Sequence, residues 1–78
     1  MTPEKKLWLN VILKTVDDAK ELRRKLHIAK FPQEIAFLSR ERRILLEEVK
    51  SDWFHEICDY CDFSQDWVVE EMHKIFKE

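Results

Sequence analysis

The lack of glycine is the feature that most constrains the fold of this chain. Its 78 residues contain no glycine, and proline occurs only as Pro3 and Pro32. Sheet-based folds need many tight turns, and several turn types need glycine. Hydrophobic residues make up 45% of the chain and charged residues 38%, which is too apolar for intrinsic disorder. The sequence therefore predicts an all-α fold with short connections, organised as one domain over residues 1–78.

Helix start and stop signals divide the chain into segments. Thr2 can cap a first helix that has Pro3 at its first position. Phe31–Pro32 ends this helix, because the residue before a proline is pushed out of the α conformation. Ser51 and Ser64 can cap two shorter helices further along. Apolar residues recur at helical spacing between these signals. The sequence predicts four helices, over residues 3–29, 33–50, 52–61 and 65–77.

The lengths of these helices suggest how they pack. The first two are long and closely joined, which favours a long antiparallel hairpin. The last two are short and flank a tight turn at residues 62–63, which is typical of a helix-turn-helix-like arrangement. The side chains expected on the buried faces are Trp8, Val11, Ile12, Val16, Ala19, Leu22 and Leu26, then Ile35, Phe37, Leu38, Ile44, Leu45, Leu46 and Val49, then Trp53 or Phe54, Ile57, Cys58 and Cys61, and finally Trp67, Val68, Met72, Ile75 and Phe76.

The apolar run near the N-terminus is too short for a targeting or membrane segment. Residues 7–13 read LWLNVIL, are interrupted by Asn10 and are followed by Lys14, with no small-residue cleavage site. A membrane-spanning helix needs about 20 apolar residues. We therefore expect no signal peptide, no membrane partner and a cytoplasmic location, where thiols stay reduced.

The net charge of −2 conceals two parts of opposite charge. Residues 1–50 hold twelve Lys and Arg against eight Asp and Glu, a balance of +4. Residues 51–78 hold two against eight, a balance of −6. A partner would therefore meet a mildly basic body and a distinctly acidic C-terminal third.

The pair Cys58–Cys61 has three interpretations. A Cys2His2 zinc site could include His55 and His73, but paired zinc ligands usually come from a turn, whereas this pair lies within a helical pattern. A redox pair needs a strand before it and a helix N-terminus, and Asp59 and Asp62 would raise a thiol pKa instead of lowering it. We favour the third interpretation, in which the thiols are small apolar side chains where the last two helices cross. No catalytic residue, metal ligand or cofactor is then expected.

Two segments resemble small phage- and prophage-encoded proteins, most of which have no assigned function. Residues 51–68, SDWFHEICDYCDFSQDWV, resemble the pattern S-D-x-F-x-x-(V/I)-C-x-x-A-G-L-(D/S)-P-x-x-V, and residues 7–19, LWLNVILKTVDDA, resemble the N-terminal segment of those proteins. Cys61 stands where they have alanine, and Asp62 stands where they have a turn glycine. Asp62 must therefore tolerate or avoid a left-handed conformation. The resemblance implies a small, non-enzymatic phage-type accessory or regulatory protein.

Two surfaces are candidates for the functional site. The first is an acidic surface on the last two helices, through which we expect a protein partner to bind; its residues are Asp59, Asp66, Trp67, Glu70 and Glu71. The second is a basic patch on the hairpin, through which the chain would bind DNA as a transcription regulator; its residues are Arg23, Arg24, Lys25, Arg40, Arg42 and Arg43. Carboxylates on the would-be recognition helix oppose phosphate binding, so the protein partner is favoured. The sequence is also compatible with a homodimer.

Overall fold

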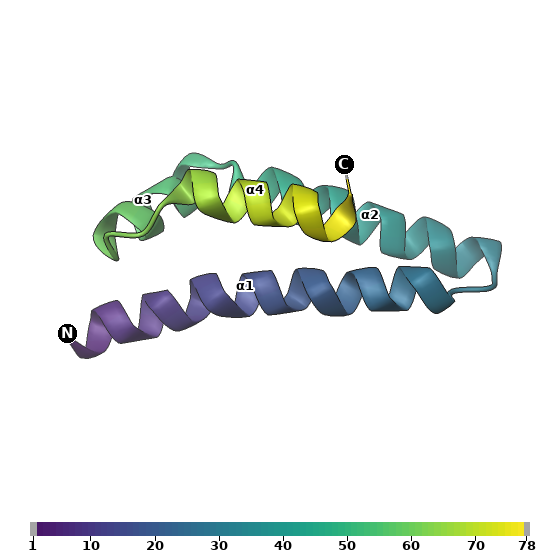
Figure 1. Cartoon of the computed structure of the whole chain (residues 1–78), viewed down its shortest axis with the longest axis horizontal. Helices are drawn as coiled ribbons and strands as arrows, with labels where there is room; N and C mark the ends of the chain where they lie inside the picture. Colours follow the sequence, from purple (N-terminus) through teal and green to yellow (C-terminus); the bar gives the residue numbers. More distant parts are fainter. Residues whose placement is uncertain (1, 78) are drawn as a thin grey trace.

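The computed structural model describes residues 2–77, and over that range the chain forms four helices and no strand (Figure 1). The helices are α1 (Pro3–Ile28), α2 (Pro32–Val49), α3 (Asp52–Tyr60) and α4 (Gln65–Phe76). The all-α prediction is confirmed, and each helix begins and ends within one residue of its predicted position.

The helix ends follow the local chemistry of the sequence. The hydroxyls of Thr2, Ser51 and Ser64 each accept a hydrogen bond from the backbone N–H three residues further along, at 3.2, 3.2 and 3.1 Å. Each bond satisfies an N–H group that the first turn of a helix leaves without a partner. Phe31, before α2, makes no such side-chain bond, and Pro32 at the first position has a backbone angle that already suits the start of a helix and no N–H of its own to satisfy.

The turn between α3 and α4 ends α3 without glycine. Asp62 takes the left-handed conformation, with φ of 54°. The N–H of Phe63 donates to the carbonyl of Cys58 at 2.8 Å, and the N–H of Asp62 donates to that of Asp59 at 3.1 Å. This pair of bonds is the Schellman motif that closes many helices. Asp62 therefore adopts the left-handed conformation that the sequence had left open, because aspartate tolerates it better than most residues.

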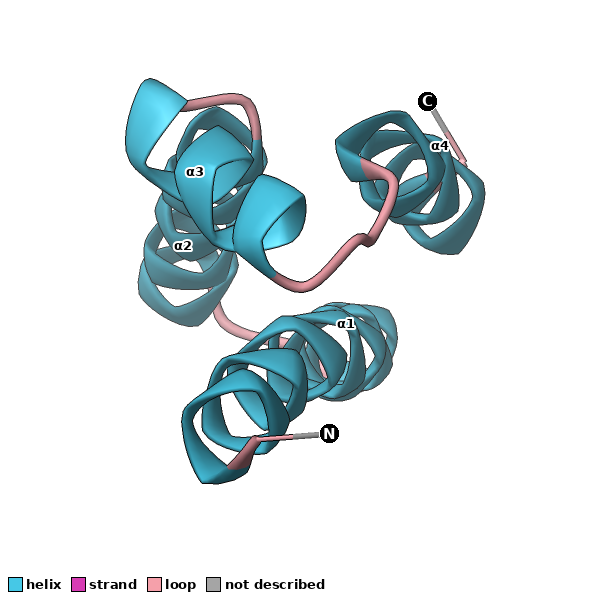
Figure 2. Ribbon diagram, turned by 90° about the vertical axis from the view of Figure 1, so that its left-hand side faces the viewer, coloured by secondary structure: helices cyan, strands magenta, loops and turns pink. Residues whose placement is uncertain are grey.

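The helices form an elongated bundle of about 44 × 20 × 18 Å. Figure 1 shows α1 and α2 running antiparallel from their short connection, with α4 lying along them and ending short of that connection. Seen end on, α1, α2 and α4 occupy three corners of a triangle, and α3 lies in front of α2 (Figure 2). A helix of 12 residues is only ~18 Å long. Hence α4 does not reach the connection between α1 and α2, and we call residues 20–43 the hairpin end.

One cluster of buried side chains draws on all four helices. Its members are Ile12, Val16, Ala19, Val49, Phe54, Ile57, Cys58, Val68, Met72 and Phe76. Within the hairpin end, Leu38 is the only described residue that is buried. The core therefore lies where α3 and α4 cover the hairpin.

Several side chains that were predicted to be buried are exposed instead. Ile35, Phe37 and Ile44 of α2 are exposed, whereas Leu38 on the same helix is buried and Leu45 and Leu46 are partly buried against the core. Trp8 and Trp67 are also exposed, and Trp53 faces solvent while its neighbour Phe54 is buried. Helical spacing identified the apolar side of each helix correctly, but the covered part of that side is narrower than predicted.

Candidate functional site

The predicted acidic surface lies on the outward side of α4, with Trp67 at its centre. The Trp67 side chain is 42% exposed, and its ring stands edge-on to that of Phe63, with centroids 5.4 Å apart and planes at 79°. Asp66 and Glu70 are one turn apart and lie on one flank of Trp67, whereas Glu71 follows it by one turn on the other flank. An exposed, well-supported indole is therefore bordered by carboxylates on both sides.

The corner between α3 and α4 brings Asp59 next to this surface. Asp59 and Asp66 both line a recess between the two helices. His55 links α3 to the start of α4, because its Nδ1 lies 2.9 Å from Gln65 Oε1. Its Nε2 lies 3.4 Å from the carboxylate of Asp59 on α3. Gln65 in turn donates from Nε2 to the Val49 carbonyl at 2.9 Å. The structure thus gathers all five predicted acidic-surface residues on neighbouring parts of α3 and α4.

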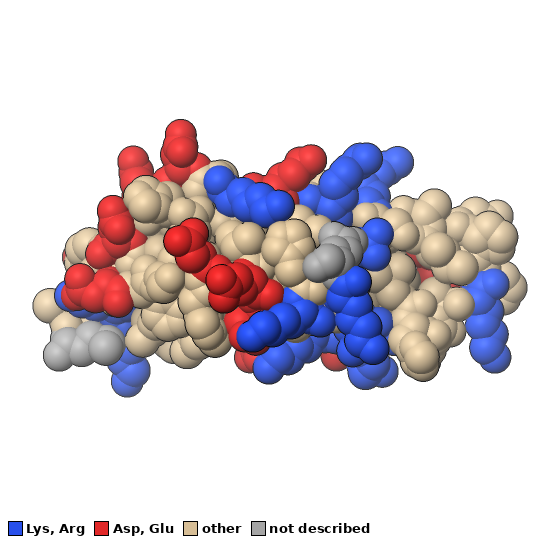
Figure 3. Space-filling view, turned by 45° about the horizontal axis from the view of Figure 1, so that its top comes forward, with Lys and Arg blue, Asp and Glu red and all other residues tan. Residues whose placement is uncertain are grey.

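The carboxylates of this region differ in how they are engaged. Glu71 lies 3.6 Å from Lys74 Nζ, and Asp62 lies 2.9 Å from Lys5 Nζ. The hydrogen bond from Lys5 to Asp62 raises the pKa of Lys5. Within residues 2–77, the carboxylates of Asp66 and Glu70 have no ion pair or hydrogen bond. Figure 3 shows the acidic side chains gathered toward the end of the molecule that carries α3.

The predicted basic residues fall into separate recesses. Arg23 and Arg24 line a recess on α1 with Lys20 and His27. Arg40, Arg42 and Arg43 line another on α2, with Ala36, Ser39 and Leu46. Lys25 lines the groove between α1 and α2 instead. Arg24 also forms a two-point hydrogen-bonded ion pair with Glu21, which raises the pKa of Arg24 and lowers that of Glu21. The six basic residues therefore lie on the hairpin but share no single recess.

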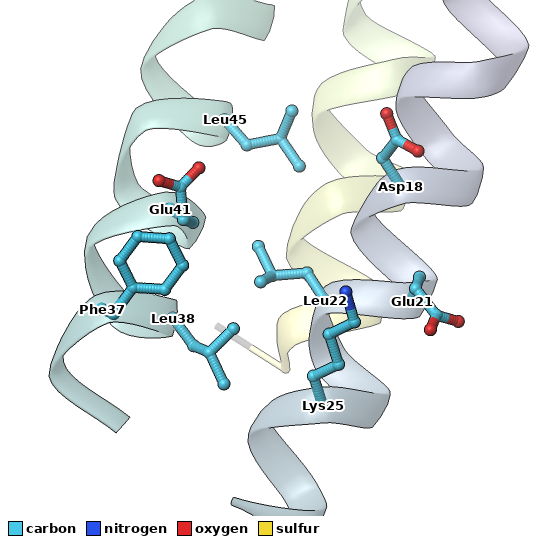
Figure 4. A pocket seen from close by; sticks show the side chains of 8 residues that line it. All are labelled: Asp18, Glu21, Leu22, Lys25, Phe37, Leu38, Glu41 and Leu45. Atoms are coloured by element: carbon cyan, nitrogen blue, oxygen red, sulfur yellow. The ribbon is translucent and has the colours of Figure 1, made fainter. Parts of the chain in front are cut away.

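The groove between α1 and α2 is apolar at its floor (Figure 4). Leu22 of α1 points toward Leu38 and Leu45 of α2, and Phe37 lies beside them. Its rim consists of Asp18, Glu21, Lys25 and Glu41. The carboxylates of Asp18 and Glu21 point away from the leucines, so they do not converge on a common point as paired catalytic carboxylates would.

The two cysteines are structurally unlike each other. Cys58 is buried in the core, and this burial raises the pKa of its thiol, with Cys61 and Asp59 adding to the effect. Cys61 caps the end of α3, is half-buried, and its Sγ–H donates to the Lys5 carbonyl at 3.6 Å. In residues 2–77, no three His, Cys, Asp or Glu side chains are grouped closely enough to hold a metal ion. A thiol with a raised pKa is a poor nucleophile at neutral pH.

The sequence analysis missed a group of aromatic side chains between α1 and α3. Trp8 of α1 and Trp53 and Tyr60 of α3 line one recess with Glu56 and Ile57, and we call these five residues the aromatic recess. Trp53 and Tyr60 are seven residues apart, which places them on one side of a helix. That spacing was available in the sequence. The contribution of Trp8, 45 positions earlier in the chain, was not.

No described helix combines the length and the apolar character that crossing a membrane requires. Comparisons with protein-family models, with curated proteins and with solved structures find no match to this chain. The resemblance of residues 7–19 and 51–68 to phage-encoded proteins therefore stays a prediction.

Proposed function

We propose that this chain is a non-catalytic protein-binding module whose contact surface is the acidic surface of Asp59, Asp66, Trp67, Glu70 and Glu71. The observation that carries the proposal is the position of Trp67, which is exposed, supported by Phe63 and bordered by carboxylates. Tryptophan is among the residues that most often dominate the binding energy of an interface. A rigid support reduces the entropy lost when the partner binds, because the indole is already held in place.

The charge of this surface supports a basic partner. Asp66 and Glu70 have no cation beside them in the described chain, so a partner's Lys or Arg can pair with them without displacing an existing partner. The residues from 51 onward carry a net charge of −6, which would speed encounters with a positively charged protein. A non-catalytic role is consistent with the buried Cys58 thiol and with the diverging carboxylates of the α1–α2 groove.

The biological role that we propose is that of a phage-type accessory or regulatory protein. This part of the proposal rests on the resemblance of residues 7–19 and 51–68 alone. The turn at Asp62 supports describing α3 and α4 as helix-turn-helix-like, because two short helices follow each other through a closed turn.

A second candidate function is DNA binding through the basic residues of the hairpin. The observation in its favour is the recess on α2, where Arg40, Arg42 and Arg43 lie together. In a helix-turn-helix, however, α4 would enter the major groove. Its outward side carries Asp66 and Glu70, which would oppose the phosphates. We therefore rank this function second.

The experiment that tests the proposal compares three baits in affinity capture from a lysate of the host cell. The baits are the wild type, Asp66→Lys with Glu70→Lys, and Arg42→Glu with Arg43→Glu. Asp66 and Glu70 face away from the buried Val68 and Met72, so their reversal leaves the core intact. Quantitative mass spectrometry should find a protein that the wild type and the arginine variant retain but the acidic-surface variant loses.

Titration of the same three proteins with duplex DNA tests the second candidate function. The second candidate would replace our proposal if the wild type binds DNA, the arginine variant loses that binding and the acidic-surface variant binds more tightly. The affinity for DNA should then also fall steeply with salt. Equal retention of every captured protein by all three baits would also overturn it.

A further inference from the structure

The aromatic recess has the size and composition of a binding site for a single side chain. Its volume is about 250 Å³. Sites for drug-sized molecules span ~300–1,000 Å³, so this recess is too small for most of them. Trp8, Trp53 and Tyr60 are 37%, 50% and 44% exposed, whereas Ile57 is buried. Single exposed aromatic residues are ordinary on protein surfaces, but here three of them converge from two separate helices.

Two contacts hold Tyr60 and Trp53 in position. The Tyr60 hydroxyl donates to Glu4 Oε2 at 3.2 Å, which joins α3 to the first turn of α1. Trp53 packs against the buried Phe54, with ring centroids 6.2 Å apart. Trp8 follows Glu4 by one turn and shares its side of α1. The recess is therefore supported from both helices.

Carboxylates surround the recess, and its lining, as far as residues 2–77 are concerned, contains no Lys or Arg. Glu56 is one of the five lining residues, Glu4 is bonded to Tyr60, and Asp52 lies one turn before Glu56. On α1, Lys5 is engaged elsewhere, with its Nζ 2.9 Å from Asp62. An apolar group entering the recess would remove water from Glu56 without offering it a partner, which is costly. The complementary occupant is a cation.

We propose that the aromatic recess binds an arginine side chain of the partner that the acidic surface recognises, an inference that rests on the proposed function. A guanidinium can stack on an aromatic ring and also donate two hydrogen bonds to a carboxylate such as Glu56. A quaternary ammonium can do only the first. Glu56 of the recess and Asp59 of the acidic surface are three residues apart on α3, so one basic segment can contact both.

The three tryptophans of the chain allow a site-resolved test by NMR. Their indole N–H signals, assigned with Trp→Phe variants, report on the recess through Trp8 and Trp53 and on the acidic surface through Trp67. The probe is a short unstructured peptide with a single arginine, and the matched control is the same peptide with citrulline, which keeps the shape but lacks the charge. We expect the arginine peptide to shift the signals of Trp8 and Trp53, and the citrulline peptide to leave them in place.

Two variants of equal charge sharpen this test. Glu56→Gln removes the carboxylate of the recess, and Glu34→Gln makes the same change at the exposed start of α2, in the hairpin end. Glu56→Gln should weaken binding of the arginine peptide by about fivefold, as expected for a pairing worth ~1 kcal/mol, while Glu34→Gln should not. The amide spectra of both variants show whether the fold is retained.

The inference is overturned if the arginine peptide leaves the signals of Trp8 and Trp53 in place, if the citrulline peptide shifts them as much, or if Glu34→Gln weakens binding as much as Glu56→Gln. Failure here is distinguishable from failure of the proposed function. Loss of captured protein on reversing Asp66 and Glu70 would keep the acidic surface as the binding site even if Trp8 and Trp53 never respond to arginine.

Discussion

The hairpin end and the α3–α4 unit are similar in length but differ in how their apolar side chains are used. Residues 20–43 contain one buried residue, Leu38, whereas residues 52–76 contain six. The hairpin end is not short of apolar residues, since Ile28, Phe31, Ile35 and Phe37 all lie there, but each is exposed. Over most of its length it lacks a third helix, because α4 ends short of the α1–α2 connection (Figure 1).

The two regions also differ in charge. The hairpin end holds eight Lys and Arg against three Asp and Glu, while residues 52–76 hold one against seven. Figure 3 shows this separation along the length of the molecule. Residues 52–76 therefore contribute more buried side chains to the core and also carry the proposed binding surface. We expect the hairpin end to open first in local unfolding, because it has few buried side chains.

The largest effect is expected for a core substitution in α4. Met72 is fully buried, so Met72→Ala should lower the free energy of unfolding by about 2–5 kcal/mol. The matched change at the hairpin end, Ile35→Ala, should cost less than about 1 kcal/mol, because Ile35 is exposed. Urea unfolding followed by circular dichroism measures both. Equal losses of unfolding free energy in the two variants would show that Ile35 is covered in solution. The contrast between the hairpin end and the α3–α4 unit would then be wrong.

A smaller effect is expected within the Cys58–Cys61 pair. Cys58→Ala should destabilise the chain by about 1 kcal/mol, since it leaves a void in the core, while Cys61→Ala should cost less because Cys61 is only half-buried. The same unfolding measurement applies. A greater loss at Cys61 would mean that the packing between α1 and the end of α3 matters more than the core position.

Replacing Asp62 with glycine should stabilise the turn between α3 and α4. Glycine has no Cβ to oppose a φ of 54°, so Asp62→Gly should raise the stability by up to about 1 kcal/mol. Asp62→Ala removes the same carboxylate but keeps a Cβ, and it should not stabilise. Thermal melts of the two variants separate the backbone effect from the loss of the Lys5 contact. A similar shift for both would assign the effect to that contact.

The smallest expected effect is a pH dependence of stability. Burial raises the pKa of Cys58 in the folded state, so the unfolded thiol loses its proton first as the pH rises. The unfolded state then binds fewer protons than the folded state, and stability falls. Between about pH 8 and about pH 10 the wild type should therefore lose more stability than Cys58→Ala. Cys61→Ala serves as the control, because burial, the largest cause of the raised pKa, remains at Cys58, and it should lose more stability than Cys58→Ala. Parallel pH profiles for all three proteins would contradict the burial of Cys58.

The helix boundaries could be predicted because their causes are local. Thr2, Ser51 and Ser64 act on N–H groups three residues away, and Pro32 acts on its immediate neighbour. Burial could be predicted only in part. Whether Ile35 is covered depends on where α4 ends in space, and no periodicity within α2 contains that information.

Some features of the candidate site could likewise be predicted from the sequence, and others could not. The outward position of Asp66 and Glu70 follows from their spacing opposite Val68 and Met72 and was predicted. Trp67 was included in the acidic surface but was also expected to pack inward, and the structure exposes it. The aromatic recess was missed because Trp8 meets Trp53 only through the packing of α1 against α3.

The central claim is that Trp67 anchors a protein partner on the acidic surface. The most direct measurement is the affinity of the captured partner for Trp67→Ala by titration calorimetry, with Phe31→Ala as the matched loss of an exposed aromatic side chain at the hairpin end. A dominant interface residue contributes ~2 kcal/mol or more, so Trp67→Ala should weaken binding by about thirtyfold, while Phe31→Ala should leave it within about twofold of the wild type. Undiminished binding by Trp67→Ala, or a greater loss with Phe31→Ala, would contradict the claim.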